Sequence, residues 1–294
     1  MYKSGFVGLI GRPNVGKSTL LNTIIGEQIS ITSNVPQTTR NQIKGIFSDV
    51  RGQIVFIDTP GIHQTTAKFG EILNETALNV LSDSDIDVVL YIVDVSRPFG
   101  PEEKFLSENI LHQKKPFILV FNKIDCPRTF IKEYTQLFSD FKSVDISALN
   151  KTNTEELIEK IFNYLPEGEP YFDPEEITDQ NLRFITAEII RKHVIINMQD
   201  EIPHATAVRI EEFKELPDGS AVIDAVIYVE TESQKKIMIG KDGSKIKTIK
   251  NFSKRELKNF IQGSITLTLN VKEKHNWRKN NGFLKSLGYT EKTN

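Results

Sequence analysis

The stretch GRPNVGKS, residues 11–18, decides the fold of the first half of this chain. It follows the apolar run Phe6–Ile10 directly, and a helical pattern over Ser18–Ile25 begins where it ends. Its two glycines let successive backbone N–H groups turn toward one anion, and the start of the following helix adds its positive dipole end. A strand, this loop and a helix in that order predict a phosphate-binding loop.

On the C-terminal side of this loop, short apolar runs alternate with amphipathic stretches. Strands are expected at Ile43–Phe47 (an edge strand), Ile54–Asp58, Val88–Asp94, Phe117–Asn122 and Val144–Ile146, and helices at Glu71–Leu81, Glu102–Leu111, Phe130–Phe138 and Thr154–Tyr164. Buried strands separated by helices are typical of a mostly parallel sheet with helices on both faces. We therefore expect an α/β domain at residues 1–168, a proline-containing linker at 169–180 and a second domain at 181–294.

Three further motifs each follow one of the expected strands: DTPG at Asp58–Gly61, NKID at Asn122–Asp125 and SAL at Ser147–Leu149. Ligands of open α/β sheets bind beyond the carboxyl ends of the strands, so these motifs should gather at the phosphate-binding loop. The Asp125 carboxylate only accepts hydrogen bonds and therefore suits the two donors on the edge of guanine. The Ala148 N–H can donate to the guanine O6. The set predicts a site for a guanine nucleotide.

The same motifs supply groups for the phosphates and for Mg²⁺. Lys17 offers an ammonium to the β- and γ-phosphates, and the Gly61 N–H can meet the γ-phosphate. The Ser18 hydroxyl is a hard oxygen ligand for Mg²⁺, and Asp58 can hold the ion through water.

The four motifs resemble the G1, G3, G4 and G5 elements of translation-factor-class GTPases. The resemblance locates the G2 element in QTTR, residues 37–40, where Thr39 is expected to bind Mg²⁺ in the GTP state. Thr38 is the alternative, and a surface loop with no ligand role remains open. Ile62 stands where many GTPases have a glutamine that orients water, which implies slow hydrolysis. In related GTPases an asparagine at the place of Asn14 helps to bind K⁺, which would stabilise charge on the phosphates.

The expected ligands of GTP or GDP are Gly11, Arg12, Pro13, Asn14, Val15, Gly16, Lys17, Ser18, Thr19, Asp58, Thr59, Pro60, Gly61, Ile62, Asn122, Lys123, Asp125, Ser147 and Ala148. The residues expected to act in catalysis are Lys17, Thr39 and Gly61. Those expected to bind Mg²⁺ are Ser18, Thr39 and Asp58.

Charge is distributed unevenly along the chain. The formal net charge of −2 conceals a basic end, because residues 235–294 hold 15 of the 37 Lys and Arg but only 4 of the 39 Asp and Glu. Such an excess indicates a polyanion as partner, either nucleic acid or an anionic membrane. The alternative is a solvated basic helix face.

The second half has its own pattern of elements. Helices are expected at Asn181–Gln199, Ser233–Ile239 and Ser244–Gln262, strands at Ala205–Phe213, Ala221–Glu230 and Ser264–Val271, and the loop GKDG at Gly240–Gly243. The order α-β-β-α-GxxG-α-β resembles a KH domain of type II topology, whose GxxG loop closes on about four nucleotides of single-stranded RNA. A plain basic α+β domain without nucleic acid is the alternative. The residues that the resemblance assigns to RNA are Gly240, Lys241, Asp242, Gly243, Lys245, Lys247 and Lys250.

The tail KEKHNWRKNNGFLKSLGY, residues 272–289, is basic and carries Trp277, Phe283 and Tyr289. Trp277 can serve as a stacking platform for a base, which would extend the RNA surface. Equally, a C-terminal helix can dock these aromatic side chains on the sheet of the KH domain.

A Ras-like GTPase domain followed by a KH domain, with QTTR, DTPG, NKID and WRKNNGFLKSLGY, resembles the Era family of bacterial GTPases over essentially the whole chain. The resemblance implies a monomer that binds the single-stranded 3′ end of 16S ribosomal RNA and assists assembly of the small ribosomal subunit. It also implies peripheral association with the inner face of the cell membrane. A GTPase that acts on another RNA or at the membrane surface remains the alternative.

The composition bounds these expectations. The single cysteine, Cys126, excludes an intramolecular disulfide and is interpreted as a packed or incidental thiol, and the five histidines lack metal-ligand spacing. No run of about 18 apolar residues is present, and the N-terminus lacks a signal-peptide pattern. The cytoplasm is therefore the expected compartment.

Overall fold

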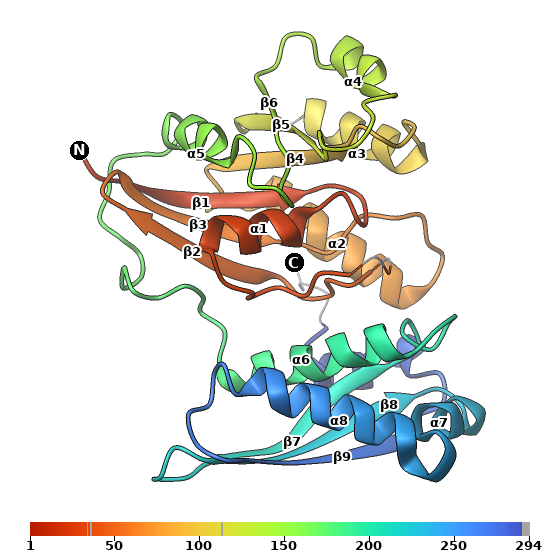
Figure 1. Cartoon of the computed structure of the whole chain (residues 1–294). Helices are drawn as coiled ribbons and strands as arrows, with labels where there is room; N and C mark the ends of the chain where they lie inside the picture. The colour runs from red at the N-terminus through yellow and green to blue at the C-terminus, as the bar shows by residue number, and fades with distance from the viewer. Residues whose placement is uncertain (34, 36, 113, 290–294) are drawn as a thin grey trace. The chain divides into compact units, whose positions relative to one another are not determined.

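The computed structural model describes residues 1–33, 35, 37–112 and 114–289 of the chain (Figure 1). The chain divides into two compact units. Unit 1 comprises Met1–Thr66 and Gly70–Asp179, and unit 2 comprises Ala67–Phe69 together with the chain from Gln180 onward.

Unit 1 is built on a six-stranded sheet with the strand order β2-β3-β1-β4-β5-β6. Its strands are β1 (Lys3–Ile10), β2 (Ile43–Asp49), β3 (Gly52–Asp58), β4 (Val88–Asp94), β5 (Phe117–Asn122) and β6 (Ser143–Asp145). Only the edge strand β2 runs antiparallel to its neighbour among these strands, whereas the other neighbours pair in parallel. The expected edge strand and the mostly parallel sheet are therefore confirmed.

Five helices cover the sheet: α1 (Lys17–Ile25), α2 (Lys68–Ser82), α3 (Pro101–Leu111), α4 (Ile131–Leu137) and α5 (Thr154–Phe162). Alternate residues of β4 belong to two different cores, as Leu90 packs with residues of α1 and α5 and Tyr91 with residues of α2, α3 and α4. Successive strand residues point to opposite faces, so this division shows that both faces of the sheet are buried. The layers are visible in Figure 1.

The segment 169–179, expected to be a linker, packs on unit 1 instead. The Gln53 side chain on β3 is fully buried and hydrogen-bonds the backbone of Phe172 in both directions, at 2.9 and 3.0 Å. On the edge strand β2, the Ile46 N–H donates to the Ile177 carbonyl at 2.9 Å. The proline spacing did not indicate these contacts, because their partners on β2 and β3 lie far away in the sequence.

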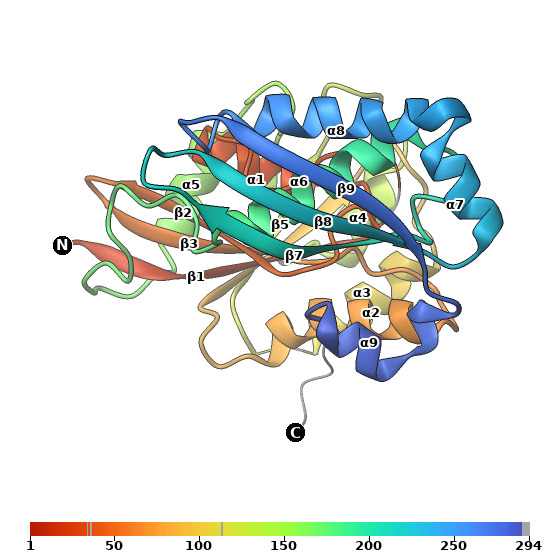
Figure 2. The same ribbon diagram turned by 90° about the horizontal axis from the view of Figure 1, so that it is seen from below.

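Unit 2 contains α6 (Leu182–Asn197), β7 (Ala207–Glu215), β8 (Ala221–Val229), α7 (Glu232–Ile239), the 3₁₀ turn η1 (Lys241–Gly243), α8 (Ser244–Leu257), β9 (Ile265–Glu273), the 3₁₀ turn η2 (Trp277–Lys279) and α9 (Asn281–Ser286). Strand β8 pairs antiparallel with β7 and parallel with β9 (Figure 2). Apolar residues of α6, α7 and α8 form one core with β7, β8 and β9. This element order is the one expected for a type II KH domain.

Two features are absent from the part of the chain that the structure describes. None of the described helices combines the length and the apolar character needed to cross a membrane. Within residues 1–33, 35, 37–112 and 114–289, no group of three or more His, Cys, Asp or Glu is arranged to hold a metal ion.

Candidate functional site

The phosphate-binding loop closes tightly on the loop that carries NKID. Gly16 has a φ of 102°, a conformation that favours glycine, and a Cβ there would lie 2.2 Å from Asn122 Nδ2. The Asn122 side chain donates to the Val15 carbonyl at 2.7 Å and accepts from the Ala148 N–H at 2.9 Å. One asparagine therefore joins the phosphate-binding loop, NKID and SAL, which the sequence analysis expected to gather.

Lys17 begins α1 and lies almost completely buried at the floor of the loop. Its Nζ donates to the carbonyls of Gly11 and Arg12, at 2.9 and 3.1 Å. Burial lowers the pKa of Lys17 to about 8, although the nearby Asp58 carboxylate acts in the opposite direction. An anionic phosphate at this place would favour the charged ammonium.

Three oxygen-bearing side chains from different elements meet beside Lys17. The Ser18 hydroxyl donates to Asp58 Oδ2 at 2.5 Å and lies 2.8 Å from Thr39 Oγ1. Asp58 is fully buried, and its Oδ1 has no hydrogen-bond partner in the described part of the chain. Burial raises the pKa of Asp58, against the hydrogen bond from Ser18 and the Lys17 charge. Hard oxygens and an unsatisfied carboxylate oxygen are the donor set that Mg²⁺ prefers, so these residues fit the ion.

The two threonines of QTTR differ in their contacts. Thr39 Oγ1 faces Ser18, whereas Thr38 Oγ1 donates to the Val35 carbonyl at 2.5 Å and lies 2.8 Å from Ser33 Oγ. Thr38 is therefore engaged within its own loop, and this geometry favours Thr39 over Thr38 as the oxygen beside Ser18.

NKID is held by side chains from two other strand ends. Lys123 Nζ lies 2.7 Å from Asp94 Oδ2, at the end of β4, and the Ser147 hydroxyl donates to Asp125 Oδ1 at 2.5 Å. Burial raises the pKa of Asp94, but hydrogen bonds from Lys123 and Ser96 outweigh it and leave this pKa below its usual value. Asp94 belongs to none of the sequence motifs and was therefore not predicted. Its position at the end of an expected strand was the available signal.

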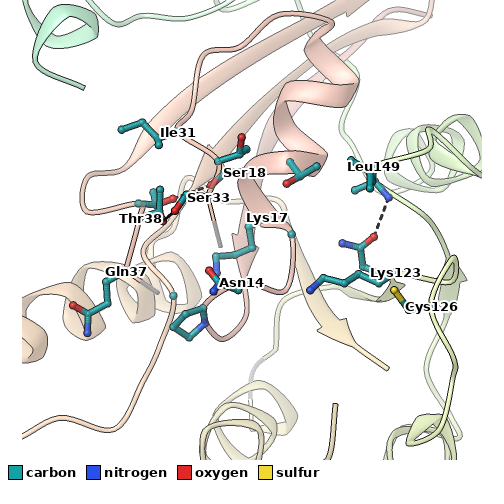
Figure 3. A pocket seen from close by; sticks show the side chains of 18 of the residues that line it. Asn14, Lys17, Ser18, Ile31, Ser33, Gln37, Thr38, Lys123, Cys126 and Leu149 are labelled. Carbon is teal, nitrogen blue, oxygen red and sulfur yellow. Dashed lines mark hydrogen bonds between the residues drawn. The ribbon is translucent and has the colours of Figure 1, made fainter. Parts of the chain in front are cut away.

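These motifs surround one pocket with a volume of about 310 Å³ (Figure 3). Of the predicted nucleotide ligands and Thr39, the lining includes Pro13, Asn14, Gly16, Lys17, Ser18, Thr19, Thr39, Gly61, Asn122, Lys123, Asp125 and Ala148. The pocket is also lined by Ile31, Thr32, Ser33, Gln37, Thr38, Cys126 and Leu149, which were not predicted as nucleotide ligands. Most of these lie between α1 and β2, in a loop that carries no recognisable motif apart from QTTR. Cys126, interpreted as packed or incidental, is half-buried at the pocket.

Some predicted ligands turn their side chains into the interior. Ile62 and Val15 belong to the apolar cores, and the Arg12 guanidinium is buried against Glu103. Thr59 is fully buried and donates to the Leu9 carbonyl at 2.6 Å. These side chains are therefore engaged in the interior, and the contacts predicted for these residues with a nucleotide would come from their backbone.

The GKDG loop lies between α7 and α8 in unit 2. Gly240 and Gly243 both have positive φ, 74° and 73°, and a Cβ on Gly240 would lie 2.9 Å from the Lys245 side chain. Lys241, Asp242, Lys245 and Lys247 are exposed, and Lys250 is half-buried. The loop therefore presents its charged side chains to solvent, as a surface that contacts RNA phosphates requires.

Trp277 does not fit the stacking role considered for it. The indole is fully buried, its Nε1–H donates to the Ala205 carbonyl at 2.9 Å, and its ring packs on Phe283, which in turn packs on Tyr228 of β8. A fully buried ring offers no free face to a base. The contacts of Trp277 and Phe283 favour the alternative interpretation, in which the tail docks aromatic side chains on the KH sheet.

Comparisons with known proteins identify both units. Residues 6–123 match the family described as 50S ribosome-binding GTPase, and residues 201–278 match the KH domain family. Over its whole length the chain is 44% identical to GTPase Era of Carboxydothermus hydrogenoformans, with 99% of each chain covered. The chain belongs to the Era family of GTPases. GTPase Era of Clostridioides difficile is 43% identical, with 99% of this chain and 100% of that protein covered.

Solved structures of Era agree with this assignment. A crystal structure of Era in complex with MgGDPNP and nucleotides 1506–1542 of 16S ribosomal RNA has a TM-score of 0.93 and 35% identity, and covers 99% of this chain and 100% of that one. A single-residue variant of Aquifex aeolicus Era bound to GDP·AlF4⁻ has a TM-score of 0.92 and 35% identity, covering 98% of this chain and 100% of that one. The Ras-like GTPase domain and the C-terminal KH domain expected from the sequence are therefore confirmed.

Proposed function

We propose that this chain is a GTP-dependent switch that binds the single-stranded 3′ end of 16S ribosomal RNA and assists assembly of the small ribosomal subunit. The observation that carries the proposal is the likeness, over 99% of this chain, to Era solved with MgGDPNP and a 16S ribosomal RNA fragment. Two features of the structure support the proposal: the pocket of unit 1, which residues of the nucleotide motifs line, and the GKDG loop of unit 2.

The groups around the pocket support GTP hydrolysis by neutralising the charge of the phosphates and by positioning the nucleotide. Lys17 and the backbone N–H groups of the loop hold the β- and γ-phosphates, while Asp125 and Ala148 hold guanine. Ser18 and Thr39, with Asp58 through water, would hold Mg²⁺, which neutralises charge that develops on the phosphates. The Gly61 N–H meets the γ-phosphate. A Cβ at this position would lie 2.6 Å from Pro13, so the close approach of the two loops requires glycine.

Slow intrinsic hydrolysis follows from the residue after DTPG. The Ile62 side chain is buried in the core, so it neither orients water nor leaves room for a glutamine without repacking. Another group must then stabilise the transition state of GTP hydrolysis. Asn14 lines the pocket with a φ of 64° and is the side chain that we assign to a K⁺ ion.

RNA binding is assigned to the GKDG loop and its flanking lysines. The glycines at both ends of the loop permit close approach of the RNA backbone, and Lys241, Lys245 and Lys247 neutralise phosphates. GTP orders the loops around Thr39 and Gly61, which makes RNA binding depend on nucleotide state. This monomeric switch would act in the cytoplasm, and the basic C-terminal end supports at most peripheral contact with an anionic membrane.

The decisive test is binding of a short single-stranded oligonucleotide with the 16S 3′-end sequence, at fixed salt, with a GTP analogue, with GDP and without nucleotide. Selective binding that strengthens with the GTP analogue and is lost in the double variant Gly240→Asp, Gly243→Asp supports the proposal. Equal binding of a scrambled oligonucleotide, indifferent to nucleotide, overturns the ribosomal RNA assignment and leaves the GTPase family assignment intact. Retention by anionic vesicles but not by RNA would favour the membrane-surface alternative.

A further inference from the structure

A second serine shares the carboxylate that is expected to face Mg²⁺. The Ser30 hydroxyl donates to Asp58 Oδ2 at 2.8 Å, the same oxygen that accepts from Ser18 at 2.5 Å. Ser30 is only 2% exposed and lies between α1 and QTTR, in a stretch without a recognisable nucleotide motif. One oxygen of Asp58 therefore receives two hydroxyl groups, while Oδ1 has no hydrogen-bond partner within the described residues.

The backbone of Ser30 is held from α1. The side-chain amide of Asn22 donates to the Ser30 carbonyl at 2.8 Å, and its oxygen accepts from the N–H groups of Ile29 and Ser30, at 3.1 and 2.9 Å. Asn22 lies one turn beyond Ser18 on the same helix. The helix that follows the phosphate-binding loop thus reaches Asp58 by two routes, directly through Ser18 and indirectly through Asn22 and Ser30.

We infer that Ser30, held in place by Asn22, is a positioning residue for the Mg²⁺ site. It fixes the rotation of the Asp58 carboxylate so that Oδ2 stays on the two hydroxyls and Oδ1 remains available to water on the ion. This inference rests on the proposed function, in which Ser18 and Asp58 hold Mg²⁺.

The physical reason is that few groups orient the carboxylate: besides the two serine hydroxyls, the Thr59 backbone hydrogen-bonds it and the Lys17 charge attracts it without fixing its rotation. Asp58 is fully buried, so bulk water cannot replace a lost hydrogen bond. Without Ser30, its remaining side-chain donor among the described residues is Ser18, which must also serve the metal. Groups that orient metal ligands in this way typically change metal affinity about 10- to 100-fold when they are removed.

The test measures the Mg²⁺ dependence of GDP release rather than hydrolysis. The full chain is loaded with a fluorescent GDP analogue, and its dissociation rate is recorded across a Mg²⁺ titration and in EDTA. Ser30→Ala should raise the Mg²⁺ concentration for half-maximal slowing of release about tenfold, with the rate in EDTA unchanged. Ser30→Thr, which keeps the hydroxyl, should restore the wild-type Mg²⁺ dependence.

Two further variants separate positioning from loss of packing. Asn22→Ala leaves the Ser30 hydroxyl in the chain but releases its backbone, and should also raise the Mg²⁺ requirement. Ser107→Ala removes an equally buried hydroxyl, which donates to the Lys104 carbonyl on α3, and should match the wild type. A Ser30→Ala chain that fails to fold leaves Asn22→Ala to decide the question.

Ser18→Ala distinguishes failure of the inference from failure of the proposed site. If Ser18→Ala shifts the Mg²⁺ dependence while Ser30→Ala and Asn22→Ala do not, the positioning role is overturned and the Mg²⁺ site stands. If none of the three shifts it although GDP is bound, the assignment of Ser18 and Asp58 to Mg²⁺ is itself wrong. A rise in the EDTA rate as large as that in Mg²⁺ would also overturn the inference, because it would indicate general damage to the pocket.

Discussion

Arg12 and Glu103 form a buried ion pair, with Nε 2.6 Å from Oε1, that joins the phosphate-binding loop to the first turn of α3. Both side chains are almost completely buried, at 6% and 1% exposure. The Arg12 carbonyl also accepts from Lys17. Arg12 therefore contacts the Lys17 ammonium at the floor of the pocket through its backbone, although its own side chain is buried against Glu103.

Glu103→Ala should lower the free energy of unfolding of unit 1 by about 3–5 kcal/mol, because it leaves the Arg12 charge buried without its partner. Urea unfolding followed by circular dichroism measures this loss. The exposed Glu108 on the same helix is the matched control, and Glu108→Ala should change stability by less than about 0.5 kcal/mol. In the double variant Arg12→Met, Glu103→Leu most of the stability should return, since no charge is left unpaired. A double variant as unstable as Glu103→Ala would contradict this account.

Asp94→Asn should weaken GDP binding about tenfold, the effect of losing roughly 1.4 kcal/mol from a charged hydrogen bond. Lys123 would keep its place in NKID but lose the carboxylate that holds its ammonium at 2.7 Å. Titration with a fluorescent GDP analogue measures the change. Ser96→Ala, which removes the other side-chain donor to Asp94, is the control and should weaken binding much less. Equal affinities for wild type and Asp94→Asn would show that Lys123 needs no such support.

Gln53→Ala should release the segment 169–179 from unit 1. Gln53 Oε1 accepts from the Tyr171 and Phe172 N–H groups, at 2.8 and 3.0 Å, so the variant leaves two partly buried donors without partners. We expect a loss of about 2–4 kcal/mol in unfolding free energy and faster proteolysis within 169–179. Gln42→Ala removes an exposed glutamine whose side chain also donates to a backbone carbonyl, and should change neither measurement. Unchanged proteolysis in Gln53→Ala would show that other contacts hold the segment.

Features that depend on residues close together in the sequence were predicted, whereas contacts between residues far apart in the sequence were missed. The parallel strands and the phosphate-binding loop were predicted because apolar runs and glycine spacing act locally, within a few residues of one another. Gln53 and Asp94 were missed because each depends on a partner brought near only by the fold. Ser30 was missed for the same reason, as no motif marks a serine whose partner is Asp58.

For the tail, residues 272–289, the sequence allowed two interpretations and did not decide between them. Basic residues around an aromatic side chain were compatible both with RNA stacking and with packing, and only the buried position of Trp277 separates the two. Similarly, periodicity gave the start of α8 at Ser244 but extended the helix to Gln262, beyond its observed end at Leu257. Helix ends depend on which backbone carbonyls find partners, which hydrophobic patterns do not report.

Acid should destabilise unit 2 through Glu256 on α8. This carboxylate accepts from Lys192 Nζ at 2.8 Å and lies 2.9 Å from His193 Nε2, both on α6. Burial raises the pKa of Glu256, but the hydrogen bonds from His193 and Lys192 outweigh it and leave the pKa below the usual 4.5. Because the folded-state pKa is the lower one, this stability is present above pH 4.5 and is lost as the pH falls through the folded value.

The single tryptophan lies in unit 2, so its fluorescence follows the unfolding of this unit in urea at each pH. Glu256→Gln should cost of the order of 1 kcal/mol at pH 7 and flatten the decline below pH 5. Glu212→Gln, on the exposed face of β7, should keep the wild-type pH profile. A profile for Glu256→Gln that parallels the wild type would assign the acid sensitivity to other carboxylates.

Trp277→Phe and Lys247→Ala should have opposite effects, since one side chain is buried and the other is exposed. Trp277→Phe leaves the Ala205 carbonyl without its donor and should cost unit 2 about 1–3 kcal/mol, measured by circular dichroism in urea. RNA affinity should stay at the wild-type level under conditions where the variant is folded. Lys247→Ala should keep the stability, lower RNA affinity and reduce the slope of log affinity against log salt by about 0.7, the value for one phosphate contact on a single strand. A folded Trp277→Phe that binds RNA more weakly, at an unchanged salt slope, would restore the stacking role that the buried indole argues against.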